Sequence, residues 1–479
     1  MNKKVALLTG LVTIVSLSAC KGGNNNKSNG GDLDAWWTTE GTLNKDASGN
    51  IVFEDVEISL ETVVAGNDET AFRSIVEDFN EEYAGKIRVS VSSTNQSTYE
   101  KSVAQRIQQE TNAPDLLMSH QKAHKWFADN KFVQPFDEII ETSGLSFDIN
   151  DYMSILGDLS NLGYEGTQFQ IPIDAQSMVI LYNKDMLSRL GFETAPTNNE
   201  EFMEMCKKFK QTYPGSDYLA ASIPSGESFY NDYFFNTALV QNGVELYNET
   251  DYKVDWTSDA QFKGWESARK AVNTLYNNKY AIFGDTGQSR FLANKTLFHF
   301  CLPWDVDTLL RTYANSNEMN IEAVKESKIA GCSMANLFKV NEDSTTGEYI
   351  FGDSHAFLMS TTVKDVNKKA ACLVFAKWFT ENAQAGAEWA EAGHISASHT
   401  IINSDTYNEN KFVTDFINEF YLDLNQFQTI GNNPYYEDTL KILRATTTAI
   451  SDTSDDLKTI LQKQETELNE IIDFAGIFG

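Results

Sequence analysis

Apolar positions in the early part of the chain repeat with two different periods. Phe72, Ile75, Val76 and Phe79 fall at i, i+3, i+4 and i+7, which is the apolar stripe of an amphipathic helix. In the stretch 87–91, apolar and polar residues alternate, as they do in a half-buried strand. The full pattern predicts a strand at 57–64, the helix at 72–79, a strand at 87–91, a helix at 98–110 and a strand at 115–118. Strands and helices that alternate at this spacing predict right-handed parallel crossovers and an α/β lobe.

A second unit follows without a long linker and without an internal repeat. The same patterns predict a short buried strand at 178–181 and helices at 200–210, 262–277, 369–381, 436–449 and 455–474. Two lobes that share several short crossovers would produce this order of elements.

The ends of the first strands draw attention as candidate ligand positions. In α/β sheets, ligands bind at the carboxyl ends of the strands. Asn67 and Asp68 follow the first predicted strand, and His120, Gln121 and Lys122 follow the third. We therefore predict that these polar side chains face a ligand, whereas Asp115 at the start of the third strand has a structural role.

Composition narrows the class of protein. The 479 residues include 41% hydrophobic and 12% aromatic residues, which is enough for two sizeable cores. The formal net charge of −30 is spread along the chain, and such a surface repels nucleic acid, so a DNA or RNA partner is excluded. No cofactor is predicted.

The first residues indicate export and anchoring. Lys3 and Lys4 precede an apolar stretch, 5–17, that is too short to span a bilayer comfortably, so residues 1–19 are predicted to be a signal peptide. The segment Leu17-Ser18-Ala19-Cys20 then resembles the lipobox of bacterial lipoproteins. This resemblance implies that Cys20 is lipidated, palmitate being one of the acyl chains, and becomes the mature N-terminus. Residues 20–50 are predicted to form a lipid-anchored flexible tether and a turn.

Two short features have structural interpretations. Residues 44–50 resemble a calcium loop only faintly, because strand-like residues 51–53 follow where a calcium-binding helical hand needs a helix. A turn into a β-ribbon is the better prediction. The cysteines after Cys20 form no CxxC pair, so zinc, redox and disulfide roles are not expected. Cys206 shares a helical apolar face with Phe202 and Phe209 and is predicted to lie in the core.

Four segments, taken in order, resemble family 1 of the bacterial extracellular solute-binding proteins, the group that includes maltose-binding protein. They are Ala113-Pro114-Asp115-Leu116 followed by 130–136; residues 166–182 ending in Tyr182-Asn183-Lys184-Asp185, with 196–202 after them; residues 289–295 followed by Leu302-Pro303-Trp304; and residues 352–379. Asn130 and Asn294 stand where the family usually has glycine, as does Pro303. The resemblance covers residues 57 to 475, and the order and spacing of the motifs make it specific.

The resemblance implies a two-lobe α/β fold that closes on ligand about a hinge. The first lobe would comprise residues 51–173 and 358–428, and the second lobe residues 178–355 and 429–479. It also implies a monomer that captures a carbohydrate, most simply an oligosaccharide, without chemical conversion. The captured sugar would pass to the permease subunits of an ABC transporter, and the protein would be held on the outer side of the cell membrane by the lipid on Cys20.

The family also implies particular ligand-binding residues. Trp304 resembles the tryptophan of a loop that faces the cleft in sugar-binding relatives, and Gln176 matches a crossover position that holds a cleft glutamate in maltose-binding protein. Asp174, two residues earlier, could share that role. Tyr230 and Tyr233 belong to an aromatic run that could line the cleft or fill the core. His355 and His394 lie near crossovers and are expected to have ordinary structural partners.

Three other functions stay open at this stage. A secreted glycoside hydrolase needs only two carboxylates, and the sequence cannot exclude it, although it contains neither G-x-S-x-G nor HExxH. Polyamine capture would suit an acidic cleft with aromatic walls. Ferric iron could bind the adjacent Tyr435 and Tyr436, but no other metal-binding set is apparent.

Overall fold

The computed structural model describes residues 35–223, 228–282, 287–410, 412, 416, 419, 426–452 and 456–476. The predicted signal peptide, Cys20 and residues 21–34 of the predicted tether lie outside these ranges. Residues 1–35 and 36–479 form separate units.

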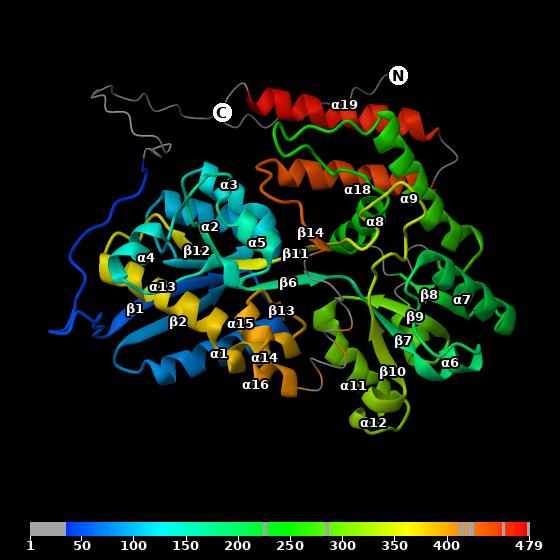
Figure 1. Ribbon diagram of the computed structural model, residues 1–479, viewed down its shortest axis with the longest axis horizontal. Helices are drawn as coiled ribbons and strands as arrows, with labels where there is room; N and C mark the ends of the chain where they lie inside the picture. Colours follow the sequence, from blue (N-terminus) through cyan, green and yellow to red (C-terminus); the bar gives the residue numbers. More distant parts are fainter. Residues whose placement is uncertain are drawn as a thin grey trace, which may run out of the picture. The chain divides into compact units, whose positions relative to one another are not determined.

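The first lobe is built on a 6-stranded sheet of order β2-β1-β3-β12-β4, with β5 paired to β12 (Figure 1). Its strands are β1 (Val56–Thr62), β2 (Ile87–Ser93), β3 (Leu116–His120), β4 (Val133–Gln134), β5 (Gln170–Pro172) and β12 (His355–Ser360). Strand β1 pairs in parallel with both β2 and β3, whereas β12 returns antiparallel to β3. The predicted strands and parallel crossovers are confirmed.

Helices cover this sheet with the faces that the apolar pattern predicted. In α1 (Asn67–Glu82), Phe72, Ile75 and Phe79 are fully buried. The predicted helix 98–110 is α2 (Tyr99–Gln108), and the predicted helix 369–381 begins slightly earlier, as α13 (Val366–Glu381). Further helices of this lobe are α3 (His124–Asp129), α4 (Asp137–Ser143), α5 (Ser154–Leu159), α14 (Ala383–Glu391), α15 (His399–Ile402) and α16 (Asp405–Glu409). Asp115 has the expected structural role, because its carboxylate accepts hydrogen bonds from Ser59 and Lys368.

The second lobe has a 4-stranded sheet of order β10-β7-β9-β8. Its strands are β7 (Val179–Asn183), β8 (Leu219–Ser222), β9 (Thr296–Cys301) and β10 (Ile329–Cys332). Its helices are α6 (Lys184–Arg189), α7 (Asn199–Thr212), α8 (Ser228–Gln241), α9 (Asp259–Asn277), α10 (Gln288–Leu292), α11 (Val306–Ser316), α12 (Ile321–Ser327), α18 (Tyr436–Asp452) and α19 (Leu457–Gly476). Cys206 is fully buried in α7, as predicted, between Phe202 and Phe209.

A third, 4-stranded sheet of order β13-β6-β11-β14 connects the lobes, and Figure 1 shows β6 running between them. Its strands are β13 (Ile395–Ser396), β6 (Asp174–Ser177), β11 (Ile350–Asp353) and β14 (Phe427–Gln428). Strand β6 is separated by single residues from β5 of the first lobe and β7 of the second, and β11 leads almost directly into β12. The two-lobe α/β fold is thus confirmed. The exact lobe boundaries stay a prediction.

The segment 36–50 packs against the first lobe, although it was predicted to belong to a flexible tether. The Trp36 ring stacks on Phe169 at 5.9 Å, and its indole N–H donates to the Val133 carbonyl. The turn at 44–50 leads into one antiparallel bridge, between Lys45 and Ile51, so the predicted β-ribbon is present but is limited to a single residue pair. The aromatic side chains explain why this segment is packed and not a flexible tether, because the free energy gained by burying them outweighs the flexibility that a polar composition favours.

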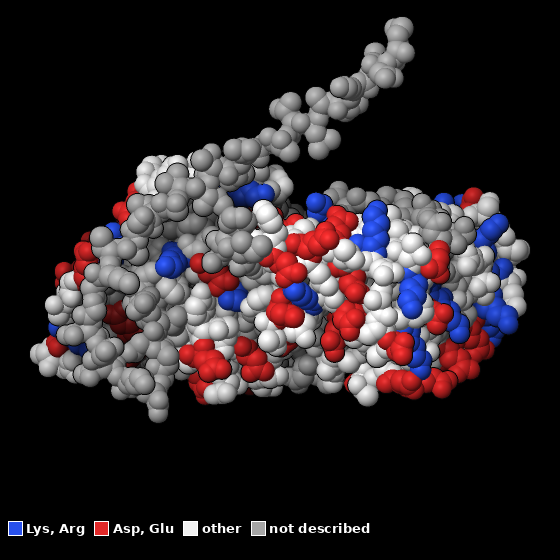
Figure 2. Space-filling model, turned by 90° about the horizontal axis from the view of Figure 1, so that it is seen from above, with Lys and Arg blue, Asp and Glu red and all other residues white. Residues whose placement is uncertain are grey.

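The remaining cysteines, Cys206, Cys301, Cys332 and Cys372, are buried and free. No helix in the described part of the chain combines the length and hydrophobicity needed to cross a membrane. On the face seen in Figure 2, Asp and Glu side chains are distributed among Lys and Arg, in keeping with acidity spread along the whole chain.

Candidate functional site

Predicted ligand residues from both lobes meet beside the connecting sheet. Asp68 lies at the start of α1, after β1, and His120 ends β3. Trp304 lies in a 3-10 turn, Pro303–Asp305, directly after β9, and Tyr233 lies in α8, which follows β8. Strand β8 is parallel to β9, so their carboxyl ends share an edge, just as those of β1 and β3 do. Asp68 and His120, which were predicted from strand ends, therefore lie in the same region as Trp304, which was predicted from the family resemblance. Tyr233, from the predicted aromatic run, lies there too.

The centre of this region is a buried charged cluster of Asp174, His355 and His394. The Asp174 carboxylate accepts hydrogen bonds from the His355 ring at 2.9 Å and from the Trp389 indole N–H at 2.7 Å. The His394 Nδ1 atom lies 3.3 Å from the same carboxylate, and its Nε2 atom lies 3.5 Å from Asp68. The ligand atoms of Asp174, His355 and His394 lie within 4.8 Å of one another, so this set could also hold a metal ion. Both ring nitrogens of His394 are buried and form no hydrogen bond in the described part of the chain.

Electrostatics in the cluster favour the ionised forms. Burial opposes ionisation of Asp174, but the charges of His355 and His394 and the hydrogen bond from His355 hold its pKa well below the usual range. Burial likewise opposes the charge on His394, yet Asp174 and Asp68 raise the pKa of this imidazole to about 9. His394 is therefore an imidazolium at neutral pH, held between two carboxylates.

Two tryptophans cover the faces of this imidazolium. Trp389 of the first lobe stacks on His394 at 4.2 Å with an interplanar angle of 8°, and Trp304 of the second lobe stacks at 6.0 Å and 15°. Gly393 has φ +98°, and a Cβ there would lie 2.4 Å from the backbone of Pro303. The turn at 393–394 is thus fitted closely against the Pro303–Trp304 turn of the other lobe.

A groove of about 780 Å³ opens beside this contact. We call it the Trp304 groove. It is lined by Asp68, Thr70, Ala71, Ser74, Trp304, Asp307, Thr308, Arg311, Lys325, Glu388, Glu391, Ala392 and Phe412. Asp305 lies next to Trp304, and burial, followed by the charge of Asp68, raises the pKa of Asp305 to about 6. Tyr230, a predicted site residue, is hydrogen-bonded to Asp305.

A second polar set, which sequence reasoning missed in part, continues the site along the lobe interface. Lys122 forms an ion pair with Asp353 of β11 at 2.8 Å, and Arg444 of α18 makes two hydrogen bonds to Asp232 of α8 at 2.7 and 2.8 Å. Lys122, Asp232, Tyr233 and Asp353 line a cavity of only about 10 Å³. Lobe surfaces that meet so closely leave room for little more than one water molecule here.

Sequence signals for this set were weak. Asp353 stands out only as an acid in an otherwise apolar strand, and Asp232 lies in an aromatic helix. Despite the attraction of Arg444, burial raises the pKa of Asp232. For Lys122 burial acts in the opposite direction, but Asp353 prevails and raises its pKa. Perturbed groups that meet between two lobes are typical of ligand sites.

The other predicted residues are placed as follows. His120 is buried with its ring 4.9 Å from that of His355, and burial lowers its pKa well below the usual value. Gln121 bonds to Thr429 and Asn432, in the segment after β14. Gln176 is fully buried in β6, opposite Asp353. Asn67 begins α1, one residue before Asp68. Whether any of them touches a ligand stays a prediction.

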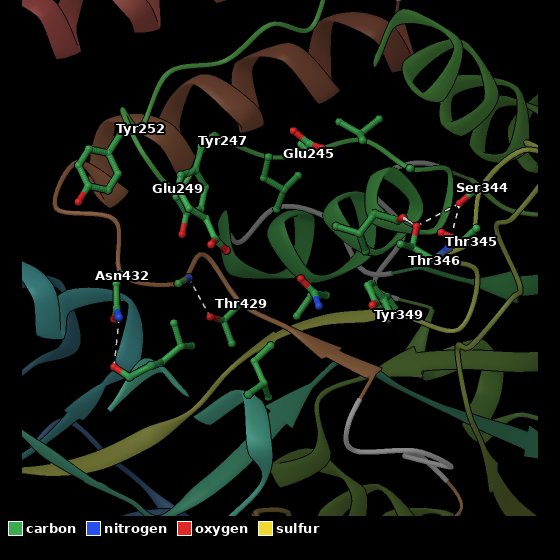
Figure 3. Close-up of a pocket in the computed structure, with 18 of the residues that line it drawn as sticks. Glu245, Tyr247, Glu249, Tyr252, Ser344, Thr345, Thr346, Tyr349, Thr429 and Asn432 are labelled. Atoms are coloured by element: carbon green, nitrogen blue, oxygen red, sulfur yellow. Dashed lines mark hydrogen bonds between the residues drawn. The ribbon is translucent and has the colours of Figure 1, made fainter. Parts of the chain in front are cut away.

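A second, separate cavity of about 840 Å³ lies at the β14 edge of the connecting sheet (Figure 3). We call it the hinge cavity. Its walls are the α5 region of the first lobe, the loop 243–252 and the segment 341–349 of the second, and residues 428–432. No residue of the predicted site lines it, although Gln121 binds two of its wall residues.

Comparisons with known proteins agree with this architecture. Residues 74–414 match the family model described as "Bacterial extracellular solute-binding protein". None of the curated proteins compared with the chain matches it.

Solved structures of similar fold cover most of the chain. The sugar-binding protein MalE from Xanthomonas citri has a TM-score of 0.70 at 14% identity and covers 88% of this chain and 99% of its own. An ABC substrate-binding protein from Listeria monocytogenes, solved with cycloalternan, has a TM-score of 0.65 at 16% identity, with 88% and 100% covered. UgpB from Mycobacterium tuberculosis, solved with glycerophosphocholine, has a TM-score of 0.67 at 14% identity, with 88% and 99% covered. At these identities the likeness establishes the fold and not the ligand.

Proposed function

The chain belongs to the bacterial extracellular solute-binding protein family, and from this premise we propose that it captures an oligosaccharide between its two lobes. One observation carries the proposal: Trp304 from the second lobe and Asp68 from the first line the same groove. An indole face can cover a pyranose ring, and carboxylates accept hydrogen bonds from sugar hydroxyls. Solved relatives of the same fold, among them those bound to cycloalternan and maltose, support a carbohydrate.

Within this proposal each group has a distinct role. Trp304 supplies the stacking surface, and Asp68 and Asp305 accept from hydroxyl groups. Lys122, Asp232 and Tyr233 would meet the sugar further along the interface once the lobes separate to admit it. Asp174, Gln176 and His120 are buried, so they position the site from behind or become accessible only when the hinge opens.

The fate of the ligand follows from the same premise. We propose that the sugar is bound without being cleaved and is handed to the permease subunits of an ABC transporter. We further propose that lipidation of Cys20 holds the protein at the outer face of the membrane. Replacing Cys20 by Ser should release the protein into the soluble fraction, and a variant that remains bound and still incorporates fatty acid would contradict the anchor.

The test of the carbohydrate site is a thermal-shift screen over a glycan panel, because a ligand raises apparent stability by mass action. Sugars that shift the parent are then titrated calorimetrically into Trp304→Ala and Trp304→Phe. Truncating a stacked Trp costs about 2 kcal/mol or more, so we expect Trp304→Ala to weaken binding more than tenfold and Trp304→Phe to weaken it less. Trp37→Ala, a half-buried tryptophan that does not line the groove, is the matched control.

The outcomes separate the rival functions. If Trp304→Ala melts much lower but binds the sugar like the parent, then Trp304 is a packing residue and the groove has been misassigned. Cleavage of the sugar during the titration would favour a hydrolase. Titration with spermidine or ferric iron in place of sugar tests polyamine capture and iron binding. If iron binds, its loss in a variant that combines Tyr435→Phe with Tyr436→Phe would identify the iron site.

A further inference from the structure

The hinge cavity and the Trp304 groove lie at opposite edges of the connecting sheet. Strand β13 forms one edge, and Ala392, just before it, lines the Trp304 groove. Strand β14 forms the other edge, and its residue Gln428 lines the hinge cavity. The cavity has a volume of about 840 Å³, within the range of sites that enclose small organic ligands. Its position therefore gives a ligand no access to the residues assigned above.

Aromatic side chains form part of its wall. Tyr247 and Tyr252 project from the loop after α8, with ring centroids 6.4 Å apart and an interplanar angle of 24°, and both are labelled in Figure 3. Tyr252 also meets Tyr435 edge-on at 5.7 Å, which fixes its orientation. Tyr349 adds a third ring from the segment before β11. Burial raises the pKa of Tyr247 and Tyr252, so their hydroxyls stay protonated and can donate.

The rest of the wall is largely polar. Asp158, Glu245 and Glu249 are exposed, and no ion pair among the described residues engages their carboxylates. The two lysines of the wall are already paired, Lys125 with Asp129 and Lys263 with Asp343. Thr345 is exposed, and Thr429 lies on the floor of the cavity, where its hydroxyl donates to Gln121 and accepts from the Gly431 N–H. Carboxylates accept hydrogen bonds, whereas threonine hydroxyls both accept and donate.

We propose that the hinge cavity is a second saccharide-binding site, distinct from the Trp304 groove. Flat tyrosine faces suit the apolar face of a sugar ring, and the mixture of acceptors with hydroxyls suits its hydroxyl groups. The choice of a saccharide rests on the proposed function, since the same oligosaccharide is available at both sites. A polyamine would use the three carboxylates but not the hydroxyl groups of the wall.

Occupancy of the hinge cavity is coupled to the arrangement of the lobes. Asp158 and Leu159 come from the first lobe, whereas Tyr247 and Glu249 come from the second. A ligand that touches both walls binds one arrangement better than others and so shifts the population toward it. Linkage then requires that a saccharide in the hinge cavity and one in the Trp304 groove change each other's affinity by the same factor.

The experiment is calorimetric titration of the full mature chain with maltotetraose and, separately, with cycloalternan. We expect two sites per chain in the parent. Tyr247→Ala and Thr345→Trp should each remove one site, the first by deleting the stacking face and the second by filling the cavity from an exposed position. Thr111→Trp, at an exposed threonine outside the cavity, is the matched control and should retain both sites. Trp304→Ala should remove the site in the Trp304 groove or weaken it more than tenfold. It should change the affinity of the hinge cavity by no more than the coupling factor.

Each result decides between the two proposals. One site per chain that Trp304→Ala weakens and Thr345→Trp leaves intact overturns the second site while sustaining the proposed function. One site that Thr345→Trp removes and Trp304→Ala leaves intact sustains the hinge cavity and overturns the assignment of the Trp304 groove. Spermidine binding that Thr345→Trp abolishes, without any saccharide binding there, overturns the saccharide class. Absence of saccharide binding to the parent at millimolar concentration overturns both.

Discussion

The Trp304 groove and the hinge cavity are similar in size, but the residues around them are fixed to the rest of the fold in different ways. The Trp304 groove lies against a fully buried ion cluster, in which Asp174 binds two histidines and a tryptophan. The hinge cavity has exposed carboxylates, two lysines that are each paired with an aspartate, and tyrosines from a loop. The groove is therefore part of the folding core, whereas the wall of the hinge cavity can change with little cost to the fold.

This difference indicates at which of the two sites the stability of the fold and the binding of ligand depend on the same residues. At the Trp304 groove, the same residues hold the lobes together and face the candidate ligand, so a substitution there changes both stability and binding. At the hinge cavity, a substitution should change binding alone. Matched substitutions in the two regions test this contrast directly.

The largest difference in stability is expected between two variants that each lose an aspartate, one from each region. Asp174→Ala leaves a buried imidazolium without its partner, and breaking a buried pair in this way costs about 3–5 kcal/mol. Asp158→Ala removes an exposed carboxylate and should change the free energy of unfolding by less than about 0.5 kcal/mol. Urea denaturation of both variants measures the two values. Equal losses would show that the cluster at Asp174 is not the anchor described here.

The second largest difference is expected when a glycine in each region is replaced by alanine. Gly393 has φ +98° and Gly431 has φ +66°, so alanine is strained at both positions. An added Cβ meets the Pro303 and Trp304 backbone at the first position but the hydroxyl end of the Tyr247 side chain at the second. We expect Gly393→Ala to cost about 1–3 kcal/mol more than Gly431→Ala, because a backbone cannot rotate away as a side chain can.

Small-angle scattering is the second readout of this pair. Gly393→Ala should enlarge the radius of gyration by holding the lobes apart, and Gly431→Ala should leave it unchanged. Identical scattering curves for the two variants would argue that the 393–394 turn does not set the separation of the lobes.

Acidity provides a third test, at Asp305. Its pKa is raised from an ordinary value of 3.8 to about 6, so the protonated form is favoured by folding. The associated stability is fully present below pH 3.8 and is lost as pH rises through about 6. Allowing for partial exposure, we expect the parent to lose about 2 kcal/mol relative to Asp305→Asn across this window. Thermal melts at a series of pH values would reveal a constant difference if Asp305 is not perturbed.

The smallest effect is expected on the wall of the hinge cavity. Lys263→Met breaks the ion pair with Asp343, whose partners are both exposed. Such pairs contribute about 0–1 kcal/mol, so the melting temperature should change little, and it should respond little to added salt. Lys122→Met, which removes the partner of the buried Asp353 carboxylate, is the comparison and should be clearly more destabilising. A loss at Lys263 as large as that at Lys122 would contradict the expectation that the wall of the hinge cavity tolerates substitution.

Much of the fold could be read from the sequence because its signals are local. The apolar stripe of α1 and the alternation in β2 report which face of each element is buried, and that face is set by neighbouring residues alone. The prediction failed at Trp36, since the polar composition of the surrounding segment hid an aromatic anchor. At residues 51–53 the predicted ribbon is shorter than expected, because pairing stops after the bridge between Ile51 and Lys45.

The candidate site was predictable where it follows strand ends or a family motif. Asp68 and His120 were predicted because parallel strands end at a shared edge, and Trp304 was predicted because its loop resembles one of the family. The site residues Asp232, Asp353 and Arg444 were missed, because an acid within an apolar helix or strand carries no local sign of its partner. Arg444 and Asp232 lie 212 positions apart, and no periodicity in the sequence links them.

By itself, then, the sequence determined the order of strands and helices, the two-lobe α/β class, the family and the residues at the strand ends. The tertiary structure alone decided that Asp174, His355 and His394 form one buried ionic cluster, although Asp174 and His355 are 181 positions apart. It also decided that Trp304 stacks on His394, and that a second cavity opens at the far edge of the connecting sheet. The physical reason is that secondary structure depends on near neighbours, whereas charge pairing, stacking and cavities depend on distances in space that only the packed chain fixes.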